Sequence, residues 1–387
     1  MNRIELTPDT LAPLRRGHPW VYRSGLTHPD ELPEPGTPVQ LVDAKGKPAA
    51  FGLSDEGPIA VRVLARHPEP ISELIKNRVT HAAALRPALV PVDTNAYRLL
   101  NGEGDGMPGL ILDRYDHTAV VRVYGRCWEP HLDSIVLATS SLPTIKTVIR
   151  RYGVRRVDGR EGGEILTGRP IDDEIIVQEA GLRFLARPFT GQKTGLFLDQ
   201  REHRIRMGRH TEGRTLINLF AYNGGFSVHA AARGAKRVIS VDIAAAALED
   251  AKENFRLNGL DPNDHDFVTT DVFKWTPSAQ ADVVICDPPS LTHGKDSDGA
   301  ARKAYRDLAA LSGSMVRPGG LLASASCTAR LNWERWEQAV REGATKVGRW
   351  SWLWRAGEPP DHPVAVGHPE GRYLKFALLT RHRARFN

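Results

Sequence analysis

One of the three cysteines in this chain stands where a nucleophile could act. Cys327 lies in SASCTARL, residues 324–331, behind the small apolar run GGLLASAS and before a polar turn. The other two, Cys127 and Cys286, are far from it and from each other, and no CxxC pair occurs, so neither a disulfide framework nor a thiolate zinc site is expected. Cys286, inside VVIC, is interpreted as a small core residue, whereas Cys327 is predicted at the exit of a buried strand.

Three carboxylates follow three strand-like runs in the same part of the chain. RVISVDI carries Asp242, DFVTTD ends in Asp271 and ADVVICD ends in Asp287. In a doubly wound sheet, ligands bind beyond the carboxyl ends of the parallel strands, so the three acids are expected at one edge. The alternative for each acid taken alone is a helix N-cap at a strand-to-helix junction.

The turn FAYNGG precedes Asp242 by about the 20 residues that separate a glycine turn from the acid that accepts from a ribose diol. It lacks the third glycine of GxGxxG, which disfavours a dinucleotide and favours S-adenosylmethionine, a nucleoside cofactor without a pyrophosphate. Asp271 is assigned to the adenine amino group. The predicted cofactor-binding residues are Phe220, Tyr222, Asn223, Gly224, Gly225, Asp242, Asp271 and Asp287.

Two prolines follow the third acid in CDPPS. Pro288 and Pro289 fix the backbone after Asp287 and leave carbonyl groups that can accept from the amine of a base. Enzymes that methylate such an amine often place an aromatic residue after the prolines to stack the base, and Ser290 stands there in this chain. This difference argues against an adenine amino group as the methyl acceptor.

A cysteine nucleophile suits a pyrimidine instead. Carbon 5 of a pyrimidine becomes nucleophilic when a thiolate attacks carbon 6, and the thiolate leaves after carbon 5 has been methylated and has lost its proton. Cys327 is predicted as that nucleophile, and Asp287 as the acid that protonates or hydrogen-bonds the nitrogen edge of the base.

Three parts of the chain are expected to position these residues. Residues 1–68 hold short strand-like runs between Pro, Gly and Asp turns, which predicts a small barrel. Residues 69–186 place strands around helices, an α+β pattern with Ile71, Leu74, Ile75 and Val79 on one helix face. Residues 187–387 alternate apolar strands with helices, which predicts an α/β domain with a parallel, doubly wound sheet.

Composition restricts the class of protein and its partners. Among 387 residues, 41% are hydrophobic and 25% charged, and no apolar run approaches the ~18 residues that span a bilayer. We therefore expect a cytoplasmic protein with no membrane partner. The net charge of +6, with 40 arginines among 52 basic residues, suits RNA, and the arginine bias of a GC-rich genome is the alternative explanation.

Nearly the whole chain resembles the ribosomal RNA large-subunit methyltransferases with an N-terminal PUA domain. The resemblance is carried, in the family's order, by LRRGHPWVY, NGEGDGMPGLILDRY, TGQKTGLFLDQREHR, NLFAYNGGFSVHAA, DPPSL, SCT and PDHPVAVGHPEGRYLKFALL. It implies a PUA-like barrel, an α+β middle domain and a Rossmann-like class I methyltransferase domain. It also implies that Cys327 is the nucleophile for 5-methylcytosine in large-subunit (23S) ribosomal RNA.

Two further readings stay open. Some relatives methylate guanine, so a guanine or adenine RNA methyltransferase, with Cys327 in a packing role, is one alternative. A non-catalytic RNA-binding factor of ribosome assembly is the other. The oligomeric state is also open, with a homodimer as one option.

Several remaining polar residues have both a functional and a structural interpretation. Lys193 and Arg201, with Pro288 and Pro289, are predicted to contact the RNA substrate, and a plain helix N-terminus is the alternative for the first two. The run NGEGDG lacks the later ligands of a calcium loop and is interpreted as a turn. No metal site is expected.

His18 and Trp20, in the N-terminal GHPW, either stack on RNA or belong to the core of the barrel.

Overall fold

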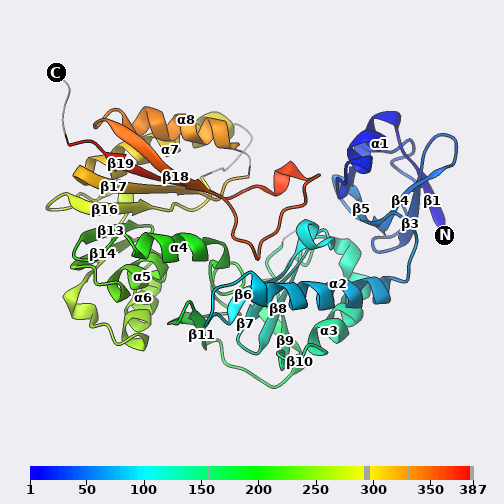
Figure 1. Ribbon diagram of the computed structural model, residues 1–387. Helices are drawn as coiled ribbons and strands as arrows, with labels where there is room; N and C mark the ends of the chain where they lie inside the picture. The colour runs from blue at the N-terminus through cyan, green and yellow to red at the C-terminus, as the bar shows by residue number, and fades with distance from the viewer. Residues whose placement is uncertain (155–156, 292–296, 330, 384–387) are drawn as a thin grey trace. The chain divides into compact units, whose positions relative to one another are not determined.

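The computed structural model describes residues 1–154, 157–291, 297–329 and 331–383, and the chain divides into two compact units (Figure 1). The first unit comprises Met1–Gly181, Ala186–Leu198 and Pro360–Gly371. The second comprises Leu182–Leu185, Asp199–Pro359 and the chain from Arg372 onward. The division into three domains at residues 68 and 186 stays a prediction beside this two-unit partition.

The first unit begins with a small five-stranded sheet of order β1-β3-β4-β5-β2. Its strands are β1 (Asn2–Glu5), β2 (Trp20–Tyr22), β3 (Pro38–Val42), β4 (Pro48–Ser54) and β5 (Ile59–Ala65), accompanied by helix α1 (Pro8–Arg15). Apolar side chains such as Val21, Val39 and Val61 fill its interior. The sheet lies entirely within the residues for which the turn-rich sequence predicts a barrel.

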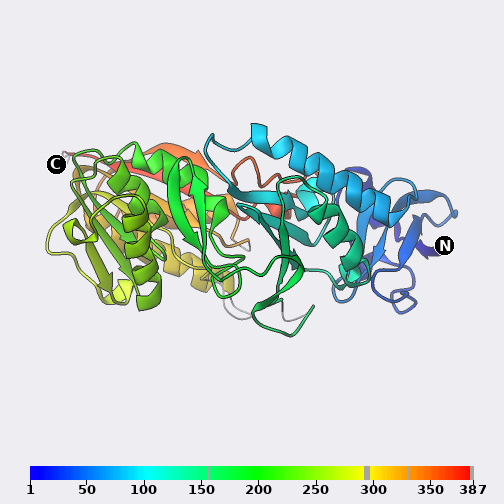
Figure 2. The ribbon, with the colours of Figure 1, turned by 90° about the horizontal axis from the view of Figure 1, so that it is seen from below.

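A second five-stranded sheet, of order β10-β9-β8-β7-β6, forms the rest of this unit's framework. Its strands are β6 (Ala96–Asn101), β7 (Leu110–Tyr115), β8 (Thr118–Val123), β9 (Thr147–Arg151) and β10 (Gly163–Gly168). Helices α2 (Ile71–Leu85) and α3 (Leu132–Ser140) pack together, and α2 can be followed in cyan-blue in Figure 2. The apolar face predicted for the first helix is confirmed, since Ile71, Leu74, Ile75 and Val79 are all buried.

Two polar contacts, one buried and one partly buried, join the small barrel to the 3-10 helices that flank the second sheet in this unit. The backbone N–H of Cys127 donates to Asp55 across 3.0 Å, and the indole N–H of Trp20 donates to Glu103 across 2.9 Å. Strands β11 (Ile175–Glu179) and β12 (Leu182–Ala186) then lead along the chain toward the second unit.

The second unit is built on a seven-stranded sheet of order β15-β14-β13-β16-β17-β19-β18. The strands are β13 (Thr215–Leu219), β14 (Arg237–Asp242), β15 (Asp266–Thr269), β16 (Ala281–Cys286), β17 (Val316–Ser326), β18 (Trp350–Ala356) and β19 (Lys375–Arg381). Neighbours from β15 through β17 run parallel, whereas β19 is antiparallel to both β17 and β18.

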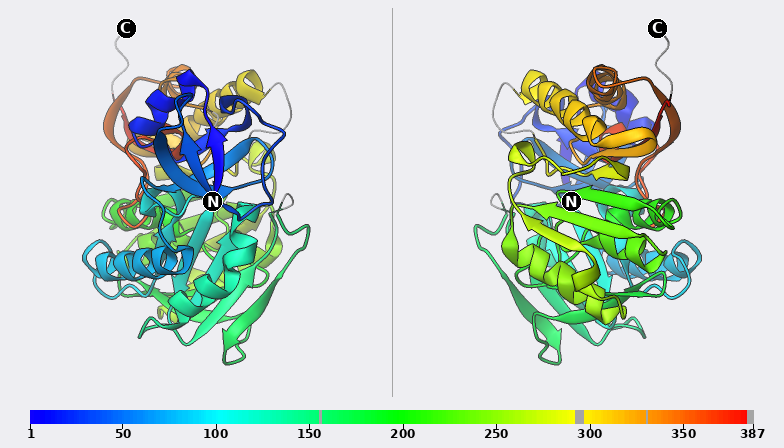
Figure 3. Two further views of the ribbon diagram at one scale, coloured as in Figure 1. Left: turned by 90° about the vertical axis from the view of Figure 1, so that its right-hand side faces the viewer. Right: turned by 90° about the vertical axis from the view of Figure 1, so that its left-hand side faces the viewer.

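Helices cover both faces of this sheet, which explains why its central strands read as nearly continuous apolar runs. In Figure 1 and in the right panel of Figure 3, the first three helices lie on one face and the last two on the other. They are α4 (Arg201–Gly208), α5 (Gly225–Ala232), α6 (Ala245–Leu257), α7 (Ser297–Ser314) and α8 (Trp333–Ala344).

The predicted fold class is therefore confirmed: the sheet is doubly wound, and its strand order reverses between β13 and β16. Ligands of such sheets bind at this reversal, beyond the carboxyl ends of the strands. Among the described helices, none is both long and apolar enough to cross a membrane.

Candidate active site

The loop between β13 and α5 has an unusual backbone. Phe220 and Tyr222 have φ angles of 59° and 47°, and Gly224 has a φ of 75°. The left-handed region costs a non-glycine residue of order 1 kcal/mol, so the surrounding structure must hold it. Part of that support comes from Ala221, whose N–H donates to Val241 O across 3.0 Å. Such conformations are concentrated at ligand-binding loops, which is where the sequence places the cofactor turn.

Asp242 fixes this loop from the end of the adjacent strand. One carboxylate oxygen accepts from the N–H of Tyr222 at 2.8 Å, and the other accepts from the N–H of Ala244 at 2.9 Å. The second bond resembles the capping alternative, because Ala244 precedes helix α6. Each carboxylate oxygen can accept a further hydrogen bond, so the predicted contact with a ribose diol is compatible with both backbone contacts.

The two glycines of the loop permit close packing beneath it. A Cβ atom on Gly224 would lie 2.8 Å from the Cβ of Ala251 in α6, and one on Gly225 would lie 2.7 Å from Arg204 Cδ in α4. Asn223 precedes the two glycines, and its carbonyl oxygen accepts a hydrogen bond from the side-chain amide of Asn254 across 2.8 Å. These contacts hold the predicted cofactor-binding loop close to α4 and α6.

Asp271 follows β15 and caps a short 3-10 helix, Val272–Lys274, by accepting from the N–H of Phe273 at 3.0 Å. This is the N-cap alternative that the sequence left open, and the other carboxylate oxygen lies 3.9 Å from the ammonium of Lys274. Phe273 is half exposed, and its ring meets the ring of Phe220 edge-on at 6.3 Å. Phe273 is a candidate wall for an adenine ring that sequence reasoning missed, although it stands two residues after the predicted acid.

Asp287, one residue beyond β16, accepts from the side-chain amide of Gln200 at 3.0 Å. The amide oxygen of Gln200 lies 2.5 Å from Nδ1 of His203. Burial lowers the pKa of His203 to about 3, so the ring is neutral. The amide of Gln200 thus lies between the carboxylate of Asp287 and a neutral histidine.

Cys327 lies one residue beyond β17, and it is the only half-buried cysteine of the three, all of which are described. Strands β16 and β17 are adjacent and pair Cys286 with Ser324, so Asp287 and Cys327 leave neighbouring strand ends. Cys286 lies in the apolar core, as interpreted from the sequence, and burial raises its pKa to about 12. Burial also raises the pKa of Cys127 well above its usual value.

Both predicted catalytic groups affect the pKa of Tyr305 in α7. Burial raises the pKa of its hydroxyl to about 12, and the charges of Cys327 and Asp287 act in the same direction. The hydroxyl lies 3.1 Å from Oγ1 of Thr328, which in turn lies 3.3 Å from Oγ of Ser290. Hydroxyl groups thus join the residue after Cys327 to the residue after the two prolines.

A buried lysine supports the turn that carries the cysteine. Lys375 pairs with Ser326 across β17 and β19, and its ammonium donates to the carbonyl oxygens of Thr328 and Tyr373 at 2.9 Å each. Its side chain is fully buried, and this burial lowers its pKa to about 8, against the opposing attraction of Glu358 and Cys327. Sequence reasoning missed Lys375, for which the only signal was a lysine inside the apolar run YLKFALL.

The residues predicted to contact RNA differ in their burial and in the unit to which they belong. Pro288 is buried and Pro289 exposed. Lys193 belongs to the first unit, where its ammonium lies over the ring of Phe197 at 4.5 Å. Arg201 belongs to the second unit, is fully buried and pairs with Glu202 at 3.2 Å. A surface phosphate contact by Arg201 would therefore require a change of conformation, and its assignment stays a prediction.

Comparison with known proteins connects this geometry to a family. Residues 144–369 match the S-adenosylmethionine-dependent methyltransferase family, and residues 4–66 match a PUA-like domain. A relative from Deinococcus radiodurans, named ribosomal RNA large subunit methyltransferase, is 39% identical over 97% of each chain. One from Tolumonas auensis, named ribosomal RNA large subunit methyltransferase I, is 34% identical over 96% of this chain and 97% of its own.

Solved structures share the fold. A methyltransferase from Streptococcus mutans matches with a TM-score of 0.86 and 22% identity, covering 98% of this chain and 100% of its own. A methyltransferase solved in complex with S-adenosylhomocysteine matches with a TM-score of 0.88 and 23% identity over the same shares. The strained loop, its glycines and Asp242 fit the nucleoside cofactor that the sequence predicts. The chain belongs to the S-adenosylmethionine-dependent methyltransferase family and carries an N-terminal PUA-like domain.

Proposed function

We propose that this enzyme methylates carbon 5 of a cytosine in the RNA of the large ribosomal subunit, through a covalent bond to Cys327. The substrate class is supported by the relatives, several of which are named ribosomal RNA large subunit methyltransferases and align with nearly the whole chain. The observation that carries the mechanism is the position of Cys327, half-buried at a strand end next to that of Asp287 and near the ammonium of Lys375.

The chemistry begins with the thiolate of Cys327. Its attack on carbon 6 forms a carbon–sulfur bond and makes carbon 5 nucleophilic, while Asp287 protonates or hydrogen-bonds the nitrogen edge of the base. When bound, S-adenosylmethionine supplies the electrophilic methyl group that carbon 5 takes up. Removal of the carbon 5 proton by a base then expels the Cys327 thiolate and restores the aromatic ring. The target base must leave its stack to reach the sulfur.

Lys375 would help to form the thiolate. A thiol with the ordinary pKa of ~8.5 is only a few per cent ionised at neutral pH, and a nearby cation favours the anion. With a pKa of about 8, Lys375 is itself mostly protonated at pH 7 and so carries that charge. Its two bonds to backbone carbonyls fix the ammonium in place, which makes it a positioning residue for the turn as well as a source of positive charge.

The residues that would hold the cofactor follow the sheet edge. We assign the ribose to Asp242 and the adenine to Asp271 with Phe220 and Phe273. The remaining cofactor contacts are assigned to Tyr222, Asn223, Gly224, Gly225 and Asp287. Lys193, Arg201, Pro288 and Pro289 remain the proposed substrate contacts, with the PUA-like barrel, residues 1–68, as an RNA-binding part.

The domain boundaries and setting complete the proposal. We propose a middle domain over 69–186 and a methyltransferase domain over 187–387, and we place the protein in the cytoplasm beside its ribosomal substrate. Whether the chain acts as a monomer or a homodimer is decided by sedimentation.

The function is tested with ribosomal RNA that lacks the modification. Large-subunit RNA and intact subunits from a deletion strain are incubated with the enzyme and methyl-labelled cofactor, digested to nucleosides and analysed by mass spectrometry. Label in 5-methylcytidine supports the proposal. Label in a methylated guanosine or adenosine, or no label with an enzyme that binds the cofactor, contradicts it.

A further inference from the structure

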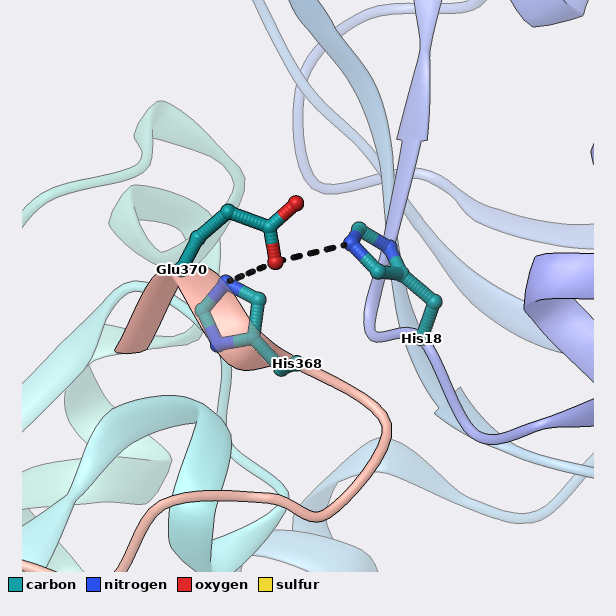
Figure 4. Close-up of side chains that lie close together, drawn as sticks. All are labelled: His18, His368 and Glu370. Atoms are coloured by element: carbon teal, nitrogen blue, oxygen red, sulfur yellow. Dashed lines mark ion pairs between the residues drawn. The ribbon is translucent and has the colours of Figure 1, made fainter. Parts of the chain in front are cut away.

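Two histidines and a glutamate lie close together in the first unit, next to the small N-terminal barrel. His18 lies on the loop before β2, and His368 and Glu370 lie on the segment Pro360–Gly371, which the chain contributes from far along the sequence. Figure 4 shows the Glu370 carboxylate between the two rings, with its Oε2 atom 3.5 Å from Nε2 of His18 and 3.9 Å from Nε2 of His368. One ligand atom from each residue lies within 4.8 Å of the other two.

We propose that His18, His368 and Glu370 bind a divalent transition-metal ion, with zinc the best match. Two imidazole nitrogens and one carboxylate oxygen form a set of ligands that zinc commonly accepts, leaving a fourth position for water. A tetrahedral ion with bonds of ~2.1 Å holds its ligand atoms about 3.4 Å apart. The separation of 3.5 Å between His18 and Glu370 is close to this value, and that of 3.9 Å between His368 and Glu370 is longer. The two histidine nitrogens, which lie within 4.8 Å of each other, would move together around the ion.

His368 is prepared to act as a ligand. Its side chain is 3% exposed, and within the part of the chain that the structure describes neither of its ring nitrogens makes a hydrogen bond. A buried, neutral imidazole without hydrogen bonds is costly for a fold, and an ion at Nε2 would remove part of that cost.

The second ring nitrogen of His18 lies near a backbone carbonyl, as is usual for histidines that bind metals. Its Nδ1 lies 3.0 Å from the carbonyl oxygen of Trp20, so a proton on Nδ1 can be donated there and Nε2 is left with a lone pair toward Glu370. The N–H of Trp20 lies 3.2 Å from the same nitrogen and favours the opposite tautomer. An ion at Nε2 would select the first tautomer.

A glycine precedes each histidine and allows the loop that holds His18 to approach the loop that holds His368. Each histidine stands in a Gly-His-Pro tripeptide, residues 17–19 and 367–369. A Cβ atom on Gly367 would lie 2.4 Å from Arg16 O and 2.7 Å from the carbonyl carbon of Gly17, so the two backbones approach as closely as glycine allows. The Trp20 ring packs against His368 with centroids 4.2 Å apart and is anchored by its bond to Glu103.

This site departs from the expectation that the chain holds no metal. The ligands come from opposite ends of the sequence and follow no spacing motif, so only the fold brings them together. The alternative role for the cluster is a metal-free contact in which Glu370 pairs with a protonated histidine. The separations of 3.5 and 3.9 Å are longer than a charge-assisted hydrogen bond, which argues against that alternative. A bound ion would fasten the Pro360–Gly371 segment to the barrel within the first unit.

The test uses the full-length chain with Cys327→Ser, so that the half-exposed thiol does not compete for metal. Zinc is titrated into chelator-treated protein by calorimetry, and cobalt is added in parallel as a probe whose absorption reports tetrahedral coordination. We expect one ion per chain, with affinity reduced at least ~30-fold by His18→Ala or His368→Ala and about 10-fold or more by Glu370→Gln. Gly367→Ala, which separates the loops, is expected to weaken binding as well.

The matched control is His117→Ala, because His117 is an exposed histidine 3.8 Å from the carboxylate of Asp116, outside the cluster. It should bind zinc like the parent. Glu370→Gln keeps the size of a half-exposed side chain, so a folded variant is expected, and circular dichroism verifies this. The proposal is overturned if zinc fails to bind at about 100 µM, or if His368→Ala and folded Glu370→Gln bind it as tightly as the parent.

Discussion

Gln200 donates a hydrogen bond to Asp287 across 3.0 Å, and the oxygen of the same amide lies 2.5 Å from Nδ1 of His203. Burial lowers the pKa of His203 to about 3, so the amide faces a neutral ring at every pH at which the protein is expected to work. Asp287 thus accepts from Gln200 in the absence of a base. A cytosine edge would share this carboxyl group with Gln200.

Gln200→Glu should change the pH dependence of methylation. A second carboxylate beside Asp287 raises the pKa of that acid by about one unit, because two like charges disfavour ionisation. Asp287 must be protonated to act as an acid, so the limb of the kcat/KM profile on which the rate falls with rising pH should move to higher pH. Gln338→Glu, in helix α8 beside Glu342, is the control and should leave the profile in place. Superimposable profiles for parent and Gln200→Glu would show that Asp287 does not titrate in the reaction.

Cys327→Ala should bind cofactor and RNA but transfer no methyl group, since the base can no longer be activated at carbon 6. RNA with 5-fluorocytosine at the target should trap the parent enzyme as an adduct that survives denaturing electrophoresis, because the fluorine cannot leave as a proton does. Cys286→Ala should retain the adduct and lose roughly 1 to 2 kcal/mol of stability as a core substitution. An adduct that persists in Cys327→Ala and vanishes in Cys286→Ala would identify the other cysteine as nucleophile.

Asp242→Ala should weaken cofactor binding by about 1.5 to 3 kcal/mol, the value of a hydrogen bond to a charged group. The loss has two sources, because the carboxylate holds the strained loop through Tyr222 in addition to its predicted contact with the ribose. Calorimetry with the cofactor measures the change. Asp266→Ala, which removes only a surface pair with Arg237, serves as the control and should bind normally. Equal affinities for all three proteins would refute the assignment.

Lys375→Met should raise the pKa of Cys327 by about one unit, because the thiolate loses its cationic neighbour. The rate of iodoacetamide alkylation as a function of pH reports this value, since Cys327 is the half-buried cysteine. Lys303→Met, at an exposed pair with Asp307, is the control. An unchanged alkylation profile in Lys375→Met would separate the lysine from thiolate formation.

The same lysine predicts a pH dependence of stability. Its pKa of about 8 in the folded chain lies below the ~10.4 of an unfolded one, so between these values the unfolded chain binds more protons. The contribution of Lys375 to the free energy of unfolding should therefore rise as the pH increases from about 8 toward 10. Urea unfolding across this range should show a rise in the parent that is smaller in Lys375→Met. An equal dependence of the free energy of unfolding on pH in the two proteins would contradict the role of Lys375.

Residues at the last position of an apolar strand or just beyond it could be placed from the sequence alone. Asp242, Asp287 and Cys327 stand at such positions, and parallel pairing brings strand ends to one edge whatever the details of packing. Fold class follows from the same periodicity.

What the sequence could not predict depends on contacts between distant segments. Gln200 and Lys375 reach the site from an α-helix start and a strand far apart in the chain, and no spacing links them to the acids. Arg201 reads as a surface cation, yet packing buries it fully. Asp271 was correctly placed after a strand, but only the backbone shows that one of its oxygens caps the next turn.

The chain passes between its two units five times, after Gly181, Leu185, Leu198, Pro359 and Gly371. A single proteolytic cut therefore leaves the pieces connected through the remaining crossings, and no simple truncation yields either unit alone. The last crossing lies four residues before Lys375. Unfolding of the Pro360–Gly371 segment would therefore loosen the start of strand β19 and with it the bond from Lys375 to the turn after Cys327. Unfolding of the first unit should therefore reduce methyl transfer, even though the proposed catalytic residues, Cys327 and Asp287, belong to the second unit.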